Sequence, residues 1–369
     1  MDAEFEIFLA TPPGLEPYLA DEAREKGFSG VNAVPGGVTL TGGWPEVWRA
    51  NLELRGASRV LARIGSFRAF HLAQLDKRAR KFPWGDILHP GQSVRVEVST
   101  NKKSKIYHAG AAKQRLETAL KEELGAVISD EAEVQIKARI DDNLVILSVD
   151  TSGESLHKRG LKAAVGKAPM RENMAALLLR ACGYVGSEPV LDPMCGSGTF
   201  PIEAAEITLG LLPGRARSFA FEKLAGFDAA QWQKMRAASK TRAIDLQFYG
   251  SDRNAGVIDM ARSNADRAGV ADCITFTHAA ISDLERPDGQ PGLIMVNPPY
   301  GARIGNKKDL FALYGSLGQV LKQRFSGWRV GIVTSEPGLA KATALPFDPP
   351  GPPIAHGGLK VTLYKTGPL

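Results

Sequence analysis

Short apolar runs alternate with helix-length amphipathic stretches along the second half of the chain. Short runs rich in Val, Ile and Leu are typical of strands buried on both faces of a parallel sheet, and the intervening stretches have the period of helices. The alternation therefore predicts an α/β fold with a mostly parallel sheet. The strands are expected at Val190–Leu191, Leu246–Tyr249, Ile274–Phe276, Leu293–Val296, Arg329–Val333 and Leu359–Tyr364.

The first half of the chain has a different pattern. Residues 1–68 predict a β-α-β-β-α-β order, which is typical of a ferredoxin-like split βαβ unit. Residues 69–157 predict a helical stretch, a strand at Gln92–Ser99 with period-two alternation, a helix at Ala111–Leu124, and a hairpin turned by Asp141-Asp142-Asn143. Both parts are therefore expected to be small α+β modules.

Length and composition agree with several globular domains. The chain has 369 residues, 44% of them apolar and 23% charged, which favours two or three domains. Neither a basic segment followed by an apolar stretch at the N-terminus nor an apolar run of about 18 residues occurs, so we expect no signal peptide and no membrane span. Cys182, Cys195 and Cys273 form no C-x-x-C pair. We therefore expect no metal site, no disulfide and a cytoplasmic location.

Positive charge is concentrated in one block of the N-terminal half. The chain carries a net charge of +6, but residues 55–121 hold 15 Lys and Arg against 4 Asp and Glu, a local +11. The rest of the chain is therefore net −5. Nucleic acid is the commonest partner of such a block, and a solvated helix face is the alternative interpretation.

One loop in this block combines basic residues with an aromatic residue directly before the helix expected at Ala111–Leu124. Lysines and a helix N-terminus suit contacts with phosphate, and an exposed ring suits base stacking. The loop is therefore a candidate RNA contact, with a plain strand-to-helix connection as the alternative. The candidate RNA-binding residues are Lys102, Lys103, Lys105, Tyr107 and His108.

The stretch PVLDPMCGSGTFPIEAA, residues 189–205, has the form of a strand, a tight turn and a helix. Its apolar run ends in Asp192, and Gly196 and Gly198 allow close approach of a ligand and positive φ. The helix that begins near Thr199 would direct its free N–H groups toward the same crevice. Ligands of open α/β sheets bind at such carboxyl ends of strands.

Two common nucleotide motifs do not fit this turn. A dinucleotide fingerprint needs G-x-G-x-x-G, and Pro201 stands where the third glycine belongs. A phosphate loop needs Gly-Lys-Ser/Thr, which is absent. An acid directly before a G-x-G-T turn instead resembles motif I of class I S-adenosylmethionine (SAM) methyltransferases. A purely structural crossover is the alternative interpretation.

The sequence Asn297-Pro298-Pro299-Tyr300 directly follows the apolar run Leu293–Val296. An exocyclic amine of a nucleobase is a poor nucleophile because its lone pair is delocalised into the ring. The side-chain carbonyl of Asn297 and the backbone carbonyl of Pro298 can accept its N–H bonds, which orients the nitrogen and stabilises its growing positive charge. The prolines stiffen the turn, and Tyr300 offers a face for a flipped base. The alternative is a proline-rich loop with a buried tyrosine.

These motifs carry a resemblance to one family. NPPY resembles motif IV of methyltransferases that act on exocyclic amino groups, and residues 69–157 resemble a THUMP domain. The segment SLHKRGLK…APMREN closely matches the connection between THUMP and catalytic domain in bacterial RNA guanine-N2 methyltransferases of the RlmL kind. The resemblance implies a seven-stranded, Rossmann-like class I methyltransferase domain preceded by ferredoxin-like and THUMP modules. Its implied boundaries are 1–68 (ferredoxin-like), 69–157 (THUMP), 158–180 (linker and first helix) and 181–369 (methyltransferase).

The same resemblance implies further contacts with the cofactor SAM. The helix start at Arg171 and Asn173 lies against the cofactor in this family. Asp252 follows Asp192 by 60 residues because of an insertion that the family also has, and its carboxylate can accept the ribose hydroxyls. The candidate cofactor-binding residues are Arg171, Asn173, Asp192, Cys195, Gly196, Gly198, Thr199, Asp252, Arg253, Ile281, Asp283 and Asn297.

The adenine contact departs from the family pattern. By resemblance, Asp283 would accept from the adenine amino group while Ile281 lies against the ring. Related enzymes often carry an acid where this chain has Ala280. The group that contacts adenine therefore stays open between the Asp283 side chain and the backbone.

The resulting hypothesis is SAM-dependent methylation of guanine N2 in RNA, with large-subunit (23S) ribosomal RNA favoured and Asn297, Pro298 and Tyr300 as catalytic residues. The same chemistry on tRNA, or a non-catalytic THUMP RNA-binding or assembly factor, are the alternatives. DNA adenine methylation shares NPPY but does not explain the THUMP-like half. Carbon-5 cytosine methylation needs a nucleophilic cysteine that NPPY lacks. No second motif I follows, so we expect one activity.

Overall fold

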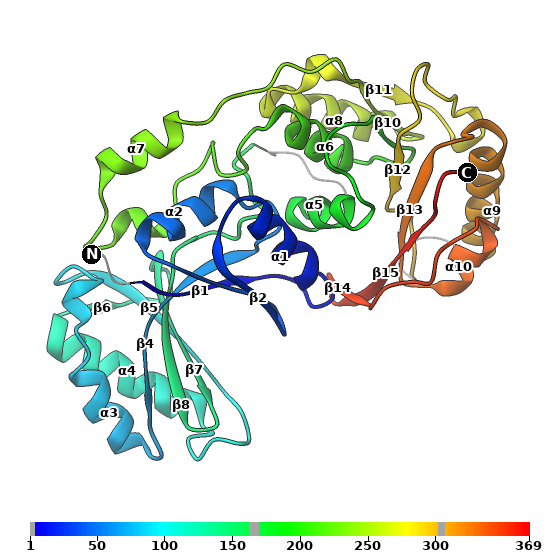
Figure 1. The fold of residues 1–369 in the computed structure, drawn as a ribbon. Helices are drawn as coiled ribbons and strands as arrows, with labels where there is room; N and C mark the ends of the chain where they lie inside the picture. Colours follow the sequence, from blue (N-terminus) through cyan, green and yellow to red (C-terminus); the bar gives the residue numbers. More distant parts are fainter. Residues whose placement is uncertain (1–3, 162–169, 302–306) are drawn as a thin grey trace. The chain divides into compact units, whose positions relative to one another are not determined.

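The computed structural model describes residues 4–161, 170–301 and 307–369 (Figure 1). The chain divides into two compact units, each assembled from separated parts of the sequence. Unit 1 contains the residues up to Ala10 together with Glu22–Leu156 and Arg217–Ala238, and unit 2 contains Thr11–Asp21, His157–Ala216 and Ser239–Leu369. A membrane-spanning helix would have to be longer and more apolar than any helix in the described ranges.

Unit 1 is built on an eight-stranded sheet with the order β2-β3-β1-β4-β8-β7-β5-β6. Strand β4 pairs antiparallel with both β1 and β8, so the strands of the first 68 residues and those of residues 69–157 share one continuous sheet. Strand β5 runs parallel to β7 and β6. The strands are β1 (Phe5–Ala10), β2 (Ser29–Val34), β3 (Gly37–Gly42), β4 (Arg59–Arg68), β5 (Ser93–Thr100), β6 (Val127–Ile128), β7 (Val134–Asp141) and β8 (Leu144–Asp150).

Local sequence explains the turns and helix ends of unit 1. The β7–β8 hairpin turns at Asp142 and Asn143, which both have positive φ, as the two-residue turn of a right-twisted hairpin requires. Helix α4 begins after His108, whose ring Nδ1 accepts from the Ala111 N–H, and ends at Gly125 with φ +69°. The expected hairpin and helix are confirmed. The helices are α1 (Glu16–Glu25, which starts in unit 2), α2 (Trp44–Glu53), α3 (Leu72–Arg80), α4 (Ala109–Leu124) and α7 (Ala229–Ala237), with 3₁₀ turns at Trp84–Asp86 and Ala220–Lys223.

Residues 217–238, which we call the insertion segment, complete unit 1 although the residues on both sides of them in the sequence belong to unit 2. Phe221 is fully buried and stacks on Trp48 of α2, with ring centroids 6.0 Å apart. Trp232 of α7 meets the Phe221 ring edge-on at 5.0 Å. Buried aromatic contacts of this kind contribute substantially to stability. The insertion segment is therefore part of the core of unit 1.

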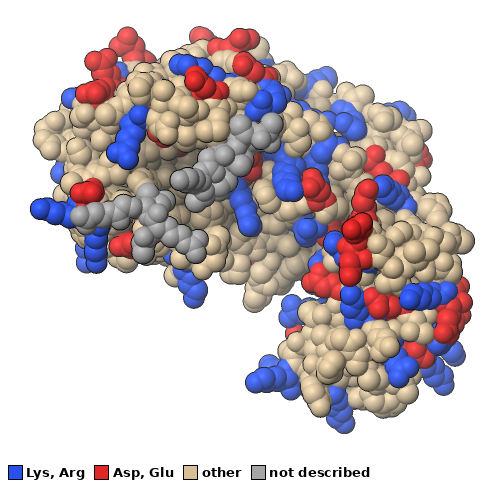
Figure 2. Space-filling view, turned by 180° about the vertical axis from the view of Figure 1, so that it is seen from behind, with Lys and Arg blue, Asp and Glu red and all other residues tan. Residues whose placement is uncertain are grey.

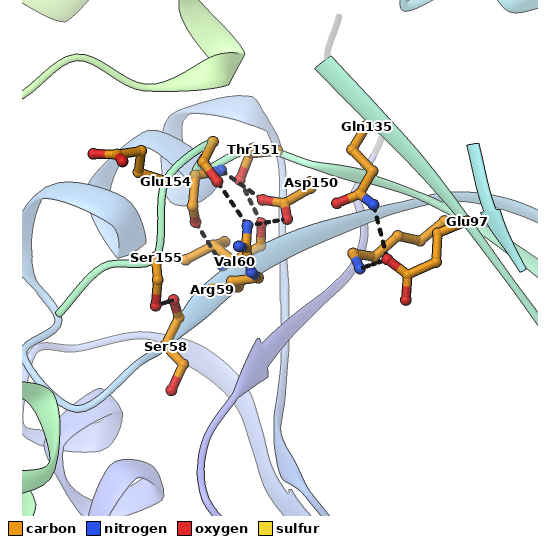
Figure 3. Close-up of polar contacts among 12 residues, drawn as sticks. Ser58, Arg59, Val60, Glu97, Gln135, Asp150, Thr151, Glu154 and Ser155 are labelled. Carbon is orange, nitrogen blue, oxygen red and sulfur yellow. Dashed lines mark hydrogen bonds and ion pairs between the residues drawn. The ribbon is translucent and has the colours of Figure 1, made fainter. Parts of the chain in front are cut away.

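Polar contacts fix the chain where it leaves β8 (Figure 3). The buried Asp150 carboxylate accepts from the Arg59 guanidinium at 2.6 Å, and the Thr151 hydroxyl donates to the Val60 carbonyl at 2.7 Å. The insertion segment adds Arg217, whose guanidinium donates to three backbone carbonyls beyond β8, those of Ser152, Glu154 and Ser155. The chain beyond β8 is thus held by two separate stretches of sequence, β4 and the insertion segment.

Unit 2 is a seven-stranded sheet with the order β11-β10-β9-β12-β13-β15-β14. The strands from β11 to β13 run parallel, and β15 runs antiparallel to both β13 and β14. The expected mostly parallel α/β sheet is confirmed. Strand β14 was not predicted, because three residues are too few to show an apolar period. The strands are β9 (Val190–Asp192), β10 (Phe248–Asp252), β11 (Ile274–His278), β12 (Leu293–Val296), β13 (Arg329–Thr334), β14 (Ile354–His356) and β15 (Leu359–Lys365).

The core of unit 2 lies between the sheet and helix α9. Ile294 and Ile332 of neighbouring strands are fully buried with Tyr314 and Leu317 of α9 and with Trp328. Strands β9, β10, β12 and β13 run parallel, so their carboxyl ends lie at one edge of the sheet. The helices are α5 (Glu172–Ala181), α6 (Thr199–Leu209), α8 (Ala255–Ala268), α9 (Lys307–Arg324) and α10 (Pro337–Ala342), with 3₁₀ turns at Ala271–Cys273 and Ile281–Asp283.

Candidate active site

The turn between β9 and α6, residues 193–198, is called the glycine turn below. Strand β9 ends at Asp192, whose Oδ1 accepts from the Met194 N–H at 3.0 Å. The Cys195 N–H donates to the Ser251 carbonyl of β10 at 2.9 Å, and the Gly198 N–H donates to the Cys195 carbonyl at 2.8 Å. Main-chain hydrogen bonds to its own residues and to the adjacent strand therefore fix this turn.

Two carboxylates end neighbouring strands at the glycine turn. Asp252 ends β10, and its two carboxylate oxygens accept from the Gly196 N–H at 3.1 Å and the Asn254 N–H at 2.9 Å. Burial raises the pKa of Asp192 well above its ordinary value, and the negative charge of Asp252 raises it further. Neither carboxylate forms an ion pair with a Lys or Arg of the described residues. The Asp252 carboxylate, which has no basic partner among the described residues, suits a positively charged ligand.

The two glycines of this turn have different surroundings. A Cβ at Gly196, where φ is +52°, would meet nothing within 4 Å, so the backbone borders open space there. A Cβ at Gly198, where φ is +84°, would lie 3.0 Å from the Phe276 ring and 3.1 Å from Ala261. Gly196 therefore leaves room for a ligand, whereas Gly198 allows α6 to pack closely on β11 and α8.

The first residues of α5 lie beside the start of α6. The Thr199 hydroxyl donates to the Met170 carbonyl at 3.5 Å, next to Arg171, which is exposed and occupies the N-cap position of α5. Asn173 is buried in the first turn of α5. The structure thus brings the predicted Arg171–Asn173 segment next to the glycine turn. Cys195 is also buried there, and burial together with the two neighbouring carboxylates raises the pKa of its thiol.

The other predicted cofactor residues lie beyond the tips of β10 and β11. The Ala279 N–H donates to the Asp252 carbonyl at 3.1 Å, which joins these two tips. Ile281 packs against the hydrophobic core of unit 2. Asp283 is exposed and accepts from the neighbouring Ser282 hydroxyl at 3.2 Å. Arg253 is exposed, and its backbone carbonyl lies 3.0 Å from His278 Nε2, which gives that histidine a structural contact.

The turn that follows β12, residues 297–301, is called the NPPY turn below. Strand β12 pairs parallel with β9, so the NPPY turn and the glycine turn lie at adjacent strand tips. The side-chain oxygen of Asn297 is buried and has no hydrogen-bond partner among the described residues. Tyr300 is half-buried against the core, and burial raises its pKa to about 12. A buried carbonyl oxygen without a donor is costly unless something donates to it.

Two residues that contact the NPPY turn were not found from the sequence. The Tyr314 hydroxyl donates to the Pro299 carbonyl at 3.3 Å, and Glu336 Oε1 accepts from the Gly301 N–H at 3.2 Å. Tyr314 follows the apolar period of α9, so its pattern predicts only core packing. Glu336 precedes Pro337 directly after a strand, which signals a helix start but not a contact with a distant turn.

The predicted RNA-binding loop joins β5 to α4 in unit 1. Lys102, Lys103 and Lys105 are exposed, and Tyr107 is 75% exposed. The Lys105 ammonium lies 5.6 Å from the centre of the Phe70 ring, which is itself exposed and was not predicted. The described part of the chain contains no group of His, Cys, Asp and Glu that could hold a metal ion.

Several basic side chains of residues 55–121 form ion pairs with acids outside that range. Arg59 and Arg63 pair with Asp150 and Glu6, which lie outside residues 55–121, and Arg80 pairs with the carboxylates of Glu122 and Glu123. Figure 2 shows basic and acidic side chains interspersed on the face in view. The loop lysines, in contrast, have no ion-pair partner among the described residues.

Sequence and structure comparisons place the chain in a family. The RMKL-like methyltransferase domain matches residues 159–346, and the RlmL ferredoxin-like domain matches residues 6–61. "Putative RNA methyltransferase slr0064" of Synechocystis sp. is 32% identical over 97% of this chain and 95% of its own length. The "Ribosomal RNA large subunit methyltransferase K/L" of Syntrophotalea carbinolica is 35% identical over 92% of this chain. The chain spans only half the length of that second relative.

Among solved structures, the crystal structure of SMU.472 complexed with SAH is 27% identical and superimposes with a TM-score of 0.90, covering 100% of this chain and 99% of that one. Fold and strand-tip motifs together define a class I SAM-dependent methyltransferase. Within that class, the chain belongs to the RMKL-like methyltransferase family, which confirms the family expected from its motifs.

Proposed function

We propose that this protein methylates the exocyclic N2 of a guanine in RNA, and that its RNA is large-subunit (23S) ribosomal RNA. The relatives from Synechocystis and Syntrophotalea, whose names specify RNA and large-subunit ribosomal RNA, support the substrate class. The choice of guanine N2 follows the resemblance of the linker, the glycine turn and the NPPY turn to enzymes of the RlmL kind.

The observation that carries the proposal is the buried, unpaired Asn297 side-chain oxygen at the tip of β12. An exocyclic amine would satisfy this acceptor by donating one N–H, with the second N–H directed to the Pro298 carbonyl. Both contacts strengthen as positive charge grows on nitrogen, so they favour the transition state over the ground state. Tyr300 would stack on the flipped base. The proton leaves the methylated nitrogen to solvent, because a positively charged amine is acidic.

The glycine turn supplies the other side of the site. SAM, when bound, supplies a methyl group on a sulfonium cation and is released as a neutral sulfide. The negative charge of Asp252 suits this cation, and Gly196 leaves the space beside it open. Asp252 would bind the ribose hydroxyls, with Ile281 and Asp283 near the adenine. Arg171, Asn173 and Thr199 would line the crevice from the α5 side.

RNA binding is assigned to unit 1. Lys102, Lys103 and Lys105 would contact phosphates, and the exposed ring of Tyr107 would stack on an unpaired base. His108 would contribute mainly by capping α4, because its ring nitrogen already accepts from the Ala111 N–H.

Mass spectrometry of nucleosides tests this function. Purified full-length protein is incubated with isotopically labelled SAM and with ribosomal or transfer RNA from a strain that lacks the protein. We expect labelled N2-methylguanosine in the large ribosomal RNA alone. Label in tRNA would move the substrate to the alternative class, and label on adenine or cytosine would contradict the assignment of the base. No label in any RNA, with SAM still bound, would favour a non-catalytic RNA-binding role.

A further inference from the structure

Within the described ranges, the NPPY turn has few hydrogen bonds of its own. Pro298 and Pro299 have no backbone N–H, so neither residue can donate within the turn. The turn nevertheless has to hold the Asn297 oxygen and the Pro298 carbonyl in fixed positions, since small displacements of a reacting group reduce rates steeply. The side chains that hold this turn therefore matter for the reaction, and they come from other elements.

The first support comes from the tip of β13. Strands β12 and β13 run parallel, with Val296 opposite Ile332, so the residues after β13 reach the same edge as the NPPY turn. Glu336 lies there and accepts from the Gly301 N–H at 3.2 Å. Its own N–H donates to the Thr334 hydroxyl at 3.3 Å, which fixes the Glu336 backbone to the end of β13.

The second support comes from α9. Tyr314 is fully buried in the core, and its hydroxyl donates to the Pro299 carbonyl at 3.3 Å. Burial raises the pKa of Tyr314, the hydrogen bond with Thr334 lowers it, and the neighbouring Tyr300 and Glu336 raise it. The hydroxyl is therefore neutral and remains a donor at physiological pH. Tyr314, Thr334 and Glu336 thus form one polar group behind the NPPY turn.

We propose that Tyr314 and Glu336 are positioning residues for methyl transfer, which hold the NPPY turn from its Pro299 carbonyl and its Gly301 amide. Neither residue contacts the reacting atoms. Both fix the C-terminal part of the turn, at Pro299 and Gly301, which leaves the Asn297 side-chain oxygen free to accept from the substrate amine. This assignment rests on the proposed function of the NPPY turn.

Steady-state kinetics of full-length variants test the proposal. Tyr314→Phe removes only the hydroxyl, Glu336→Ala removes the acceptor, and Glu336→Gln keeps a carbonyl oxygen for the Gly301 N–H. We expect kcat to fall about 10–100-fold in the first two variants, with KM for RNA and Kd for SAM within about twofold of the parent protein. Glu336→Gln should restore kcat to within about threefold. Tyr364→Phe on β15, and Glu285→Gln at an exposed position, are the matched controls.

Two results would overturn the proposal. One is a parental kcat in both Tyr314→Phe and Glu336→Ala. The other is a parallel loss of SAM affinity or thermal stability, which would indicate a general structural role. The Gln variant separates the cases further, because a structural role for the negative charge predicts no rescue.

Amide hydrogen exchange keeps the proposal testable if the proposed function fails. Should the parent protein methylate no RNA, exchange at the Gly301 amide still reports on the contact with Glu336. Faster exchange in Glu336→Ala but not in Glu336→Gln would support the positioning of the turn. Equal exchange in all three proteins would overturn it, whatever the substrate of the enzyme.

Discussion

The glycine turn and the NPPY turn lie at adjacent strand tips but are held in different ways. The glycine turn is fixed by main-chain hydrogen bonds and by Asp252 from the next strand. The NPPY turn contains two prolines and is held by Tyr314, 15 residues after Pro299, and by Glu336, 35 residues after Gly301. The turn proposed to bind the cofactor is therefore held through main-chain groups and the adjacent strand β10, whereas the turn proposed to orient the substrate is held by side chains from α9 and from beyond β13.

The sharpest test of this comparison is Asn297→Ala. This substitution removes the proposed acceptor for the substrate amine and leaves the glycine turn unchanged. We therefore expect kcat to fall by about 10²–10³ or more while SAM affinity stays within a few-fold. Methyl transfer and equilibrium binding of SAM are measured on the same preparation, with the exposed Asn32→Ala as control. Unchanged turnover would end the catalytic assignment of this residue.

A paired substitution in the glycine turn should have the next largest effect. Both Gly196→Ala and Gly198→Ala place a side chain at positive φ, which costs about 1–2 kcal/mol. The Gly198 methyl also meets Phe276 and Ala261, so this variant should lose about 1–3 kcal/mol more of unfolding free energy. The Gly196 methyl enters open space and should weaken SAM binding instead. Denaturant unfolding and SAM titration compare the two, and the reverse order would contradict the packing described.

Substitutions in the loop between β5 and α4 should leave the glycine turn and the NPPY turn intact. Replacing Lys102, Lys103 and Lys105 with alanine is expected to weaken RNA binding and to reduce the slope of log K against log salt by roughly one unit per lost phosphate contact. SAM affinity should not change. Binding measured at several salt concentrations checks this, with a Lys26→Ala variant as control. An unaltered salt slope would remove the loop from the RNA interface.

The smallest expected effect is a pH-dependent gain in stability from Asp192→Asn. The pKa of Asp192 is higher in the folded than in the unfolded protein, so the folded state holds an extra proton between the two values. Unfolding free energy therefore falls as pH rises through that window. Asparagine avoids this loss and can still accept from the Met194 N–H, so the melting temperature without SAM should rise by roughly 2–4 °C at pH 7. The gain should vanish near pH 4, and a lower melting temperature at pH 7 would contradict it.

Much of the candidate site could be proposed from the sequence because its residues follow one another along the chain. Asp192 and the two glycines stand in one strand–turn–helix stretch, and Asn297 to Tyr300 follow a buried strand directly, so period and spacing predict their positions. Tyr314 and Glu336 could not be predicted, because their contacts depend on how α9 and β13 pack against β12. The basic block was overestimated for the same reason, since Arg59 and Arg63 pair with acids far away in the sequence.

By itself, the sequence determined the α/β class, the positions of the glycine turn and the NPPY turn, and the family, because apolar period and short motifs are local properties of the chain. Tertiary structure alone decided that the insertion segment completes unit 1, that all strands before Thr151 share one sheet, and that Tyr314 and Glu336 hold the NPPY turn. These features depend on contacts between residues far apart in the chain, and such contacts exist only once the core has packed.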